Sequence, residues 1–183
     1  MKRILILFLV IGVCNTVYAQ KRYFTKTGTI SFEASTPLET INAVNKSATS
    51  VIDVSTGQIE FAVLIKGFEF NKALMQEHFN ENYMESSKYP KSVFKGTITN
   101  IQNINFSKNG AYDASVKGVL EIHGVKRNIT TTATITVSGA NVKAKTQFNI
   151  LISDYNISIP GVVRDKISKT ARINVNCIYT PLK

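Results

Sequence analysis

Apolar and polar positions alternate along most of this chain, which is the pattern of a β-strand with one buried and one solvated face. The clearest case runs from Tyr112 to Ile122, where the even positions carry apolar or small side chains and the odd positions carry mainly polar ones. The same alternation predicts further strands near residues 27–34, 48–55, 58–66, 92–106, 127–137, 141–153 and 170–180.

Eight antiparallel strands that each have one apolar face favour an all-β fold, an up-and-down barrel whose closure leaves no exposed sheet edge. A sandwich of two sheets is the competing architecture. At this number of strands the interior of a barrel is either filled with side chains or holds one small ligand.

The connections between the predicted strands fall into two groups. Thr56-Gly57, Asn109-Gly110 and Ser138-Gly139 are typical of tight turns. The other connections span residues 35–47, 67–91, 123–126 and 154–169, and three of these are long. In an up-and-down barrel alternate connections lie at opposite ends, so the pattern predicts a closed base and an elaborated mouth.

Residues 71–86 are the one segment whose pattern favours a helix. An apolar stripe recurs at every fourth position, at Met75, Phe79 and Tyr83. Three glutamates with the same spacing lie on the opposite face, at Glu77, Glu81 and Glu85. Asn71 is the expected N-cap, and Pro90 returns the chain to an extended conformation. The helix falls at the mouth, so we expect its apolar stripe to cover the open end as a lid.

Candidate catalytic and metal-binding residues are few. The two histidines, His78 and His123, lie in different segments, and the glutamates point away from the packed stripe of the helix. A metal site needs three or four converging ligands, so no metal site is predicted. No catalytic motif with a nucleophile elbow, a C-x-x-C pair or a glycine-rich phosphate loop occurs. An enzyme acting through Asp154, His78 or His123 is the weakest of the functional hypotheses.

The first nineteen residues indicate an exported protein. Met1-Lys2-Arg3 is a basic start, Ile4 to Val13 is an apolar run too short to span a bilayer, and Val17-Tyr18-Ala19 is a typical cleavage pattern. We therefore predict a signal peptide over residues 1–19 and a single domain over residues 20–183, located in a periplasm or outside the cell. The later Cys177 is expected to be a small buried apolar side chain.

The formal net charge of +10 is compatible with anionic lipid or envelope polymers as partners. Nucleic acid is not expected, because tracts such as "NKSATSVIDVSTG" (45–57) interleave no aromatic side chains with their charges. No second apolar segment is long enough for stable insertion into a membrane.

Three segments resemble the YceI-like family: "HFNENYMESSKYPKSVFKGTI" (78–98), "GVLEIHGVKRNITTTATI" (118–135) and "FNILISDYNISIP" (148–160). Their order and spacing cover most of the chain, while residues 35–55 depart from the family pattern. The resemblance implies a lipocalin-like antiparallel barrel that binds a polyisoprenoid or another long-chain amphiphile.

Such a ligand needs an apolar channel, and each buried methylene contributes roughly 0.8 kcal/mol. The inward positions of the predicted strands supply candidate lining residues: Ile30, Phe32, Phe61, Val63, Phe94, Ile98, Val116, Leu120, Ile135, Phe148 and Ile150. Basic residues at the mouth are candidates for contacting a polar or anionic headgroup: Lys126, Arg127, Arg164, Lys166 and Lys169.

The leading hypothesis is an exported protein that carries or sequesters a hydrophobic amphiphile, such as a polyisoprenoid, a quinone-like molecule or a fatty acid, without catalysis or a cofactor. The alternative is a barrel with a filled interior that acts as an interaction module of the envelope or of a stress response. The two hypotheses differ in whether the lining residues enclose a cavity or pack into a solid core.

Overall fold

The structure is a computed structural model that describes residues 22–182. The predicted signal peptide, residues 1–19, lies outside the described residues. The strands are β1 (Arg22–Glu33), β2 (Asn42–Asp53), β3 (Gln58–Leu64), β4 (Glu69–Phe70), β5 (Lys91–Ile98), β6 (Gly110–Ile122), β7 (Val125–Ser138), β8 (Asn141–Leu151) and β9 (Thr170–Pro181). The α-helix is α1 (Ala73–His78), followed by a π-helical turn (Phe79–Tyr83), and 3-10 turns cover Ile65–Gly67, Ile101–Asn103, Ile152–Tyr155 and Gly161–Val163.

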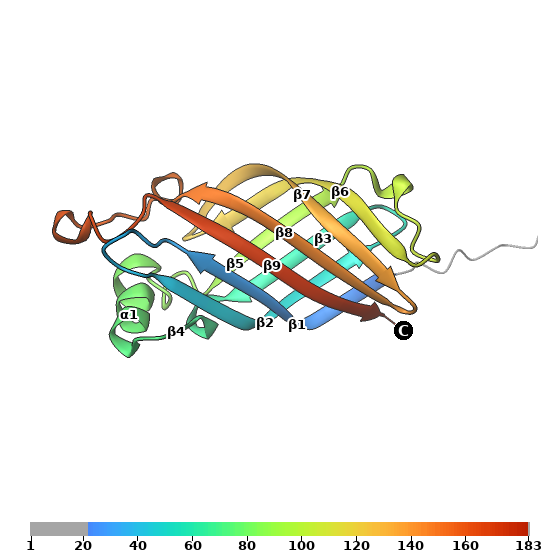
Figure 1. Ribbon diagram of the computed structural model, residues 1–183. Coiled ribbons are helices and arrows are strands. Elements are labelled where there is room, and N and C mark those ends of the chain that lie inside the picture. Colours follow the sequence, from blue (N-terminus) through green and yellow to red (C-terminus); the bar gives the residue numbers. More distant parts are fainter. Residues whose placement is uncertain (1–21, 183) are drawn as a thin grey trace, which may run out of the picture.

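The strands form one antiparallel sheet that closes on itself (Figure 1). Its order is β1-β9-β8-β7-β6-β5-β3-β2-β4, and pairing between β1 and β2 completes the circle. The strand β4 adds only two residues beside β2, so eight strands form the barrel wall. The predicted eight-stranded up-and-down barrel is therefore confirmed, and the sandwich is not the fold.

The two ends of the barrel differ as the connections predicted (Figure 1). The turns at residues 54–57 and 139–140 lie at the base, where the C-terminal end of β9 also lies. The segments 34–41, 65–90 and 152–169 gather at the opposite end, which we call the mouth. Among the helices of the described part of the chain, none is long and apolar enough to cross a membrane.

The strand predicted over residues 92–106 is too long. In the structure β5 ends at Ile98, and residues 99–109 form a base segment that contains a 3-10 turn. The side chain of Asn100 stabilises this departure from the sheet: its amide donates to the carbonyl of Asp113 at 2.9 Å, and its Oδ1 accepts from the backbone N–H of Ser115 at 2.8 Å. The segment therefore carries Ile104 and Phe106 into the core, where both are buried.

The helix predicted over residues 71–86 is shorter than expected, and its cap was assigned wrongly. The N-cap is Lys72, not Asn71, and the Lys72 side chain makes no capping hydrogen bond within residues 22–182. After His78 the chain widens into the π-helical turn, in which the N–H of Met84 donates to the carbonyl of Phe79 at 2.9 Å. We call residues 73–83 the lid. The wider turn is the kind of local irregularity often found at functional sites.

The interior of the barrel is divided into a packed half and a half with space. A base cluster of buried residues fills the lower half: Tyr23, Ile52, Ile98, Ile104, Phe106, Ala114, Val116, Ile135, Val137, Val142, Cys177 and Tyr179. Two smaller clusters surround the upper half. One includes Phe68 and Met84, and the other includes Ala171 and Ile173. Cys177 is a free, fully buried thiol, as predicted. Burial raises its pKa from 9.0 to about 11.

Candidate functional site

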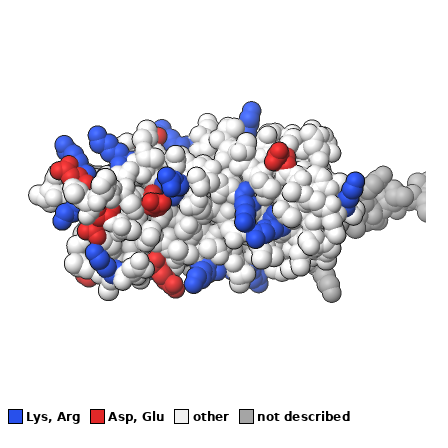
Figure 2. Space-filling view, in the orientation of Figure 1, with Lys and Arg blue, Asp and Glu red and all other residues white. Residues whose placement is uncertain are grey.

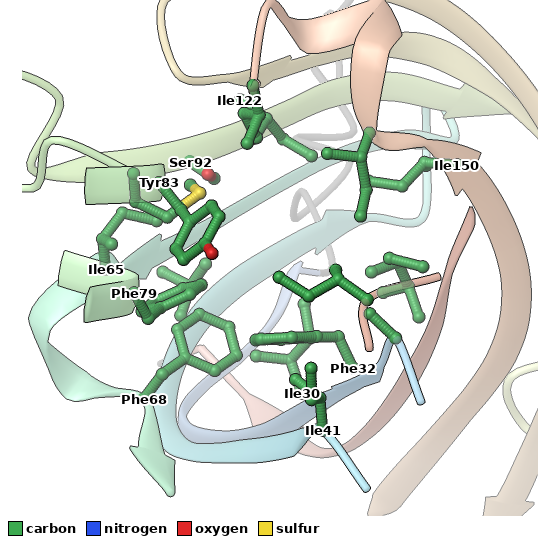
Figure 3. Close-up of a pocket in the computed structure, with 18 of the residues that line it drawn as sticks. Ile30, Phe32, Ile41, Ile65, Phe68, Phe79, Tyr83, Ser92, Ile122 and Ile150 are labelled. Atoms are coloured by element: carbon green, nitrogen blue, oxygen red, sulfur yellow. The ribbon is translucent and has the colours of Figure 1, made fainter. Parts of the chain in front are cut away.

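A cavity of about 290 Å³ occupies the upper half of the barrel and opens toward the mouth. This volume is at the lower end of the range of about 300–1,000 Å³ that is typical of ligand pockets. Strands β1, β3, β5, β6, β8 and β9 supply its wall, and the lid and the mouth segments supply its upper part. Figure 3 shows Phe79 and Tyr83 of the lid on one side of this space and Ile122 and Ile150 on the other.

The lid is anchored to the wall by a cluster of phenylalanines. The ring of Phe79 stacks on that of Phe32 with a centroid distance of 5.3 Å, and it packs on Phe70 at 5.0 Å and on Phe68 at 5.7 Å. Offset and edge-to-face contacts of this kind are favourable beyond the area that they bury. Met75 and Tyr83, the other members of the predicted stripe, also border the cavity. The apolar stripe of the lid therefore faces the cavity, as its periodicity predicted.

Polar groups at the cavity are confined to a few positions. Glu39, His78 and Lys166 border it, together with Tyr83 and Ser92. Glu39 is paired with Lys72, whose Nζ lies 2.9 Å from Oε1. This hydrogen bond and the charge of Lys72 lower the pKa of Glu39, and Lys166 adds to the effect. Figure 2 shows charged side chains of both signs gathered at the mouth end of the visible face.

The lid is also fastened at its C-terminal end. Nε2 of His123 lies 2.8 Å from Oε2 of Glu85, and Nδ1 lies 3.2 Å from the carbonyl oxygen of Tyr155. The imidazole donates a hydrogen bond through whichever ring nitrogen carries the proton, so its tautomer decides which of the two partners accepts it. The ring of Tyr89 packs edge-on against the imidazole with a centroid distance of 4.5 Å. His123 thus ties the end of the lid to the β6–β7 turn and to the 3-10 turn after β8.

Two backbone positions make this fastening possible. His123 and Gly124 both have positive φ, at 52° and 74°, and form the two-residue turn between Ile122 and Val125. Positive φ at both central positions is the geometry of a type I′ hairpin. Glu85 has φ of 42°, which turns the chain out of the lid. The sequence placed Glu85 on a solvated face and His123 in an unrelated loop, and only the fold brings them together.

Most of the predicted lining residues border the cavity: Ile30, Phe32, Phe61, Val63, Phe94, Leu120, Phe148 and Ile150. Ile98, Val116 and Ile135 do not, because they belong to the packed base cluster below it. The sequence pattern placed these three residues correctly on an inward face, but alternation says nothing about the level of a residue along the barrel axis. That the eight bordering residues bind a ligand stays a prediction.

The basic residues predicted at the mouth are spread around it. Lys166 borders the cavity, whereas the other four lie outside it. Nε of Arg127 donates to the carbonyl of Asp154 at 2.9 Å, and Nζ of Lys126 lies 3.8 Å from Oε2 of Glu121. Arg164 and Lys169 are exposed residues of the 152–169 segment. Only Lys166 is therefore placed to contact a group that emerges from the cavity.

Several cavity residues were not predicted from the sequence. They come from the mouth segments and include Ile41, Phe68, Ile157, Val163 and Ile167. Their local sequences lack a long regular period, so no pattern assigned them to a buried face. The only available signal was the presence of large apolar side chains in connections otherwise rich in polar residues.

The residues considered for chemistry lie apart from one another in the described part of the chain. His78 and His123 lie apart: His78 is exposed beside the cavity, while His123 is bound to Glu85 and Tyr155. Asp154 contributes a backbone carbonyl, not its carboxylate, to the contact with Arg127. Within residues 22–182, no group of three or more His, Cys, Asp or Glu side chains is arranged to hold a metal ion.

A closed antiparallel barrel with an apolar cavity beneath a helical lid defines the class of lipocalin-like barrels. Residues 22–178 match the model of the YceI-like domain, and the chain belongs to the YceI-like family. The resemblance seen in the three sequence segments is thereby confirmed. No curated protein matched the sequence.

Solved structures with the same fold share little sequence with this chain. A polyisoprenoid binding domain from Saccharophagus degradans, implicated in plant cell wall breakdown, is 13% identical with a TM-score of 0.77, and the match covers 89% of this chain and 99% of that one. BcnA from Burkholderia cenocepacia is 16% identical with a TM-score of 0.68, and the match covers 84% and 96%. A YceI protein from Campylobacter jejuni is 17% identical with a TM-score of 0.52, and the match covers 75% and 81%.

Proposed function

We propose that this protein is an exported carrier or scavenger that binds the apolar chain of an amphiphile in its upper cavity and catalyses no reaction. The observation that carries the proposal is the cavity of about 290 Å³, whose lining consists almost entirely of aliphatic and aromatic side chains. An apolar space of this size favours an apolar guest, because each methylene transferred from water contributes roughly 0.8 kcal/mol. Candidate guests are polyisoprenoids, quinone-like molecules and fatty acids.

Family membership supports the same proposal. The similar domain from Saccharophagus degradans is described as polyisoprenoid binding. At 13% identity the likeness concerns the fold, so the chemical identity of the guest has to come from this chain's own cavity. The predicted signal peptide of residues 1–19 supports export to a periplasm or to the outside of the cell.

The orientation of the guest follows from the distribution of polar groups. The deep wall is apolar, whereas Glu39, His78 and Lys166 stand among the cavity residues contributed by the lid and the mouth segments. A polar headgroup would lose hydrogen bonds to water if it were buried among apolar side chains. We therefore place the tail inside the barrel and the headgroup at the mouth, where Lys166 can contact an anionic group.

The direct test is to purify the protein from its native host, extract it with organic solvent and identify bound molecules by mass spectrometry. A stoichiometric amphiphile supports the carrier. Repeated absence of such a molecule, together with no calorimetric signal for isoprenoids and fatty acids, supports the alternative of an interaction module and rejects the proposal.

A pair of variants tests whether binding uses the cavity. Leu120 borders the cavity, whereas its neighbour Val119 faces outward and is 38% exposed. Leu120→Trp fills the space and is expected to weaken binding at least tenfold, while Val119→Trp adds the same bulk on the outer surface and leaves affinity unchanged. Equal affinities of both variants for the extracted molecule would exclude the cavity as the site.

A further inference from the structure

The cavity ends at a defined floor halfway down the barrel. Phe61 and Phe94 border the cavity from below and also pack against the base cluster. They lie directly opposite each other in the pairing of β3 with β5. Ile98 and Val116 of the base cluster are paired with each other on β5 and β6, nearer the base than the pair of Phe94 and Leu120.

The position of the Phe94 ring depends on two glycines. Gly96 and Gly118 are paired across β5 and β6. A Cβ atom on Gly96 would lie 2.5 Å from Cζ of Phe94, and a Cβ atom on Gly118 would lie 2.6 Å from the same carbon. Both distances are too short for carbon atoms that are not bonded to each other, so the end of the ring lies directly over the glycine pair. The backbone also leaves no room for a side chain there, because the two Cβ atoms would lie 2.4 Å from the carbonyl oxygens of Lys117 and Lys95.

The far edge of the ring therefore lies over the glycine pair, on the base side of Phe94. Along β5 the chain runs from the mouth at Lys91 to the base at Ile98, so a ring that covers Gly96 extends downward from Phe94. Side chains at positions 94, 96 and 98 share one face of the strand. Without the ring, the glycine pair would leave an open recess that continues the cavity toward Ile98 and Val116.

We infer that Phe94, seated over the Gly96–Gly118 pair, sets how deep an apolar tail can enter and so makes the protein selective for tail length. This inference rests on the proposed function, because it concerns the same cavity. The ligand class that fits is an amphiphile with a single apolar chain whose end reaches Phe94. A longer chain leaves its remaining carbons at the mouth.

The depth of the cavity above Phe61 and Phe94 is sufficient for one short segment of an apolar ligand chain. The wall residues Ile30 and Phe32 of β1, and Ala34 directly after it, are spaced two residues apart along the chain and border the cavity. Four residues of strand correspond to about 13 Å along the strand, or roughly 10 Å along the axis of a barrel with tilted strands. The cavity therefore encloses one short segment of chain and not a long coiled polymer.

The experiment measures affinity for straight-chain carboxylates of increasing length, with the whole protein and with all probes below their micellar concentrations. In the wild type, affinity is expected to rise roughly fourfold per methylene until the chain reaches Phe94 and then to level off. We call the chain length at which affinity levels off the break. Phe94→Ala and the milder Phe94→Leu are expected to move the break to longer chains. Phe94→Trp is expected to move it to shorter chains.

Phe106→Ala is the matched control. Phe106 is buried in the base cluster, where it stacks on Tyr23 with a centroid distance of 5.7 Å, and it does not border the cavity. The same loss of a ring on the far side of the floor should leave the break where the wild type has it. A break that moves equally in Phe106→Ala, or that stays unmoved in the folded Phe94 variants, overturns the inference.

A second measurement uses the unmodified protein and does not depend on the folding of variants. A carboxylate of the break length with a photoreactive diazirine on its last carbon is expected to label Phe61 or Phe94. Labelling of Ile98 or Val116 would show that the tail passes the floor and would overturn the inference. Wild-type protein that binds none of the carboxylates and none of the isoprenoids would instead reject the proposed function itself.

Discussion

The base and the mouth of this barrel are built from the same strands but use their inward side chains differently. On β5, Ile98 is 1% exposed in the packed base, whereas Phe94 is only partly buried and borders the cavity. On β6, Val116 belongs to the base cluster and Leu120 borders the cavity, with Gly118 between them, although both side chains are buried. Regular alternation therefore produces an apolar interior at every level but does not decide whether that interior is solid.

The connections at the two ends determine whether the interior is solid or contains a cavity. At the base, the segment 99–109 sends Ile104 and Phe106 into the barrel, where Phe106 stacks on Tyr23 and completes a solid core. At the mouth, the apolar side chains of the lid lie over the opening, and Phe79 packs against the wall residue Phe32. One end is thus plugged and the other is covered, and covering leaves the space beneath it free.

The largest expected effect is a difference in the free energy of unfolding that is lost when an isoleucine of the base or of the cavity wall is replaced by alanine. Ile135 is 1% exposed in the base cluster, and Ile135→Ala is expected to lower the free energy of unfolding by about 2–5 kcal/mol, since it leaves a hole in a packed core. Ile150 already borders empty space, so Ile150→Ala should cost about 1 kcal/mol or less. Urea unfolding measures both, and equal losses would contradict the division into a solid and a hollow half.

The second prediction concerns the ionisation of Cys177 in the base cluster. Its thiol has a pKa of about 11 in the folded protein against 9.0 as the ordinary value, because burial disfavours the thiolate. The folded state therefore keeps a proton that the unfolded state has already lost, and stability should fall between pH 9 and pH 11, by up to about 1.4 kcal/mol per pH unit.

Urea unfolding at several pH values across this interval checks the slope. In Cys177→Ala the contribution of the thiol to the slope should disappear, whatever the absolute stability of the variant. A slope that is identical in the two proteins would show that the thiol is accessible to water or that other groups dominate the alkaline loss.

The third prediction tests the fastening of the lid. Glu85→Gln weakens the contact with His123 and is expected to cost about 0.5–1 kcal/mol, because Glu85 is 44% exposed on its side chain. Amide hydrogen exchange in residues 79–89 should become roughly two- to fivefold faster, with the base strands unchanged. Glu81→Gln is the control, since Glu81 is exposed on the same lid and has no ion pair among the described residues. Faster exchange in both variants would argue against a specific role of His123.

The smallest expected effect concerns the headgroup. Lys166→Glu at the mouth should weaken binding of an alkyl carboxylate by roughly two- to fivefold at low salt and leave an alcohol of the same chain length nearly unaffected. Lys108→Glu makes the same change of charge at the base and should alter neither affinity. Equal losses for the carboxylate and the alcohol in Lys166→Glu would contradict a contact with the headgroup.

Much of the fold could be predicted because it depends on local periodicity. The alternation at Tyr112–Ile122 and the tight turns at Thr56-Gly57 and Ser138-Gly139 predicted strands and a base that the structure contains. The stripe of Met75, Phe79 and Tyr83 predicted which side of the lid meets the cavity. The cap at Asn71 was wrong, because the helix begins one residue later, after Lys72. The strand through residue 106 was wrong, because contacts of Asn100 with Asp113 and Ser115 on β6, which local sequence does not specify, turn the chain out of the sheet.

The sequence alone predicted that every strand has an apolar side and that the long segments collect at one end, and it favoured a closed barrel over a sandwich of two sheets. These predictions follow from a period of two residues and from the parity of the connections. Only the tertiary structure decided that the interior is divided at Phe94, that Ile98, Val116 and Ile135 lie below this division, and that His123 meets Glu85. These facts depend on how far along the axis each side chain lies and on which distant segment packs beside it, and alternation carries no information about either.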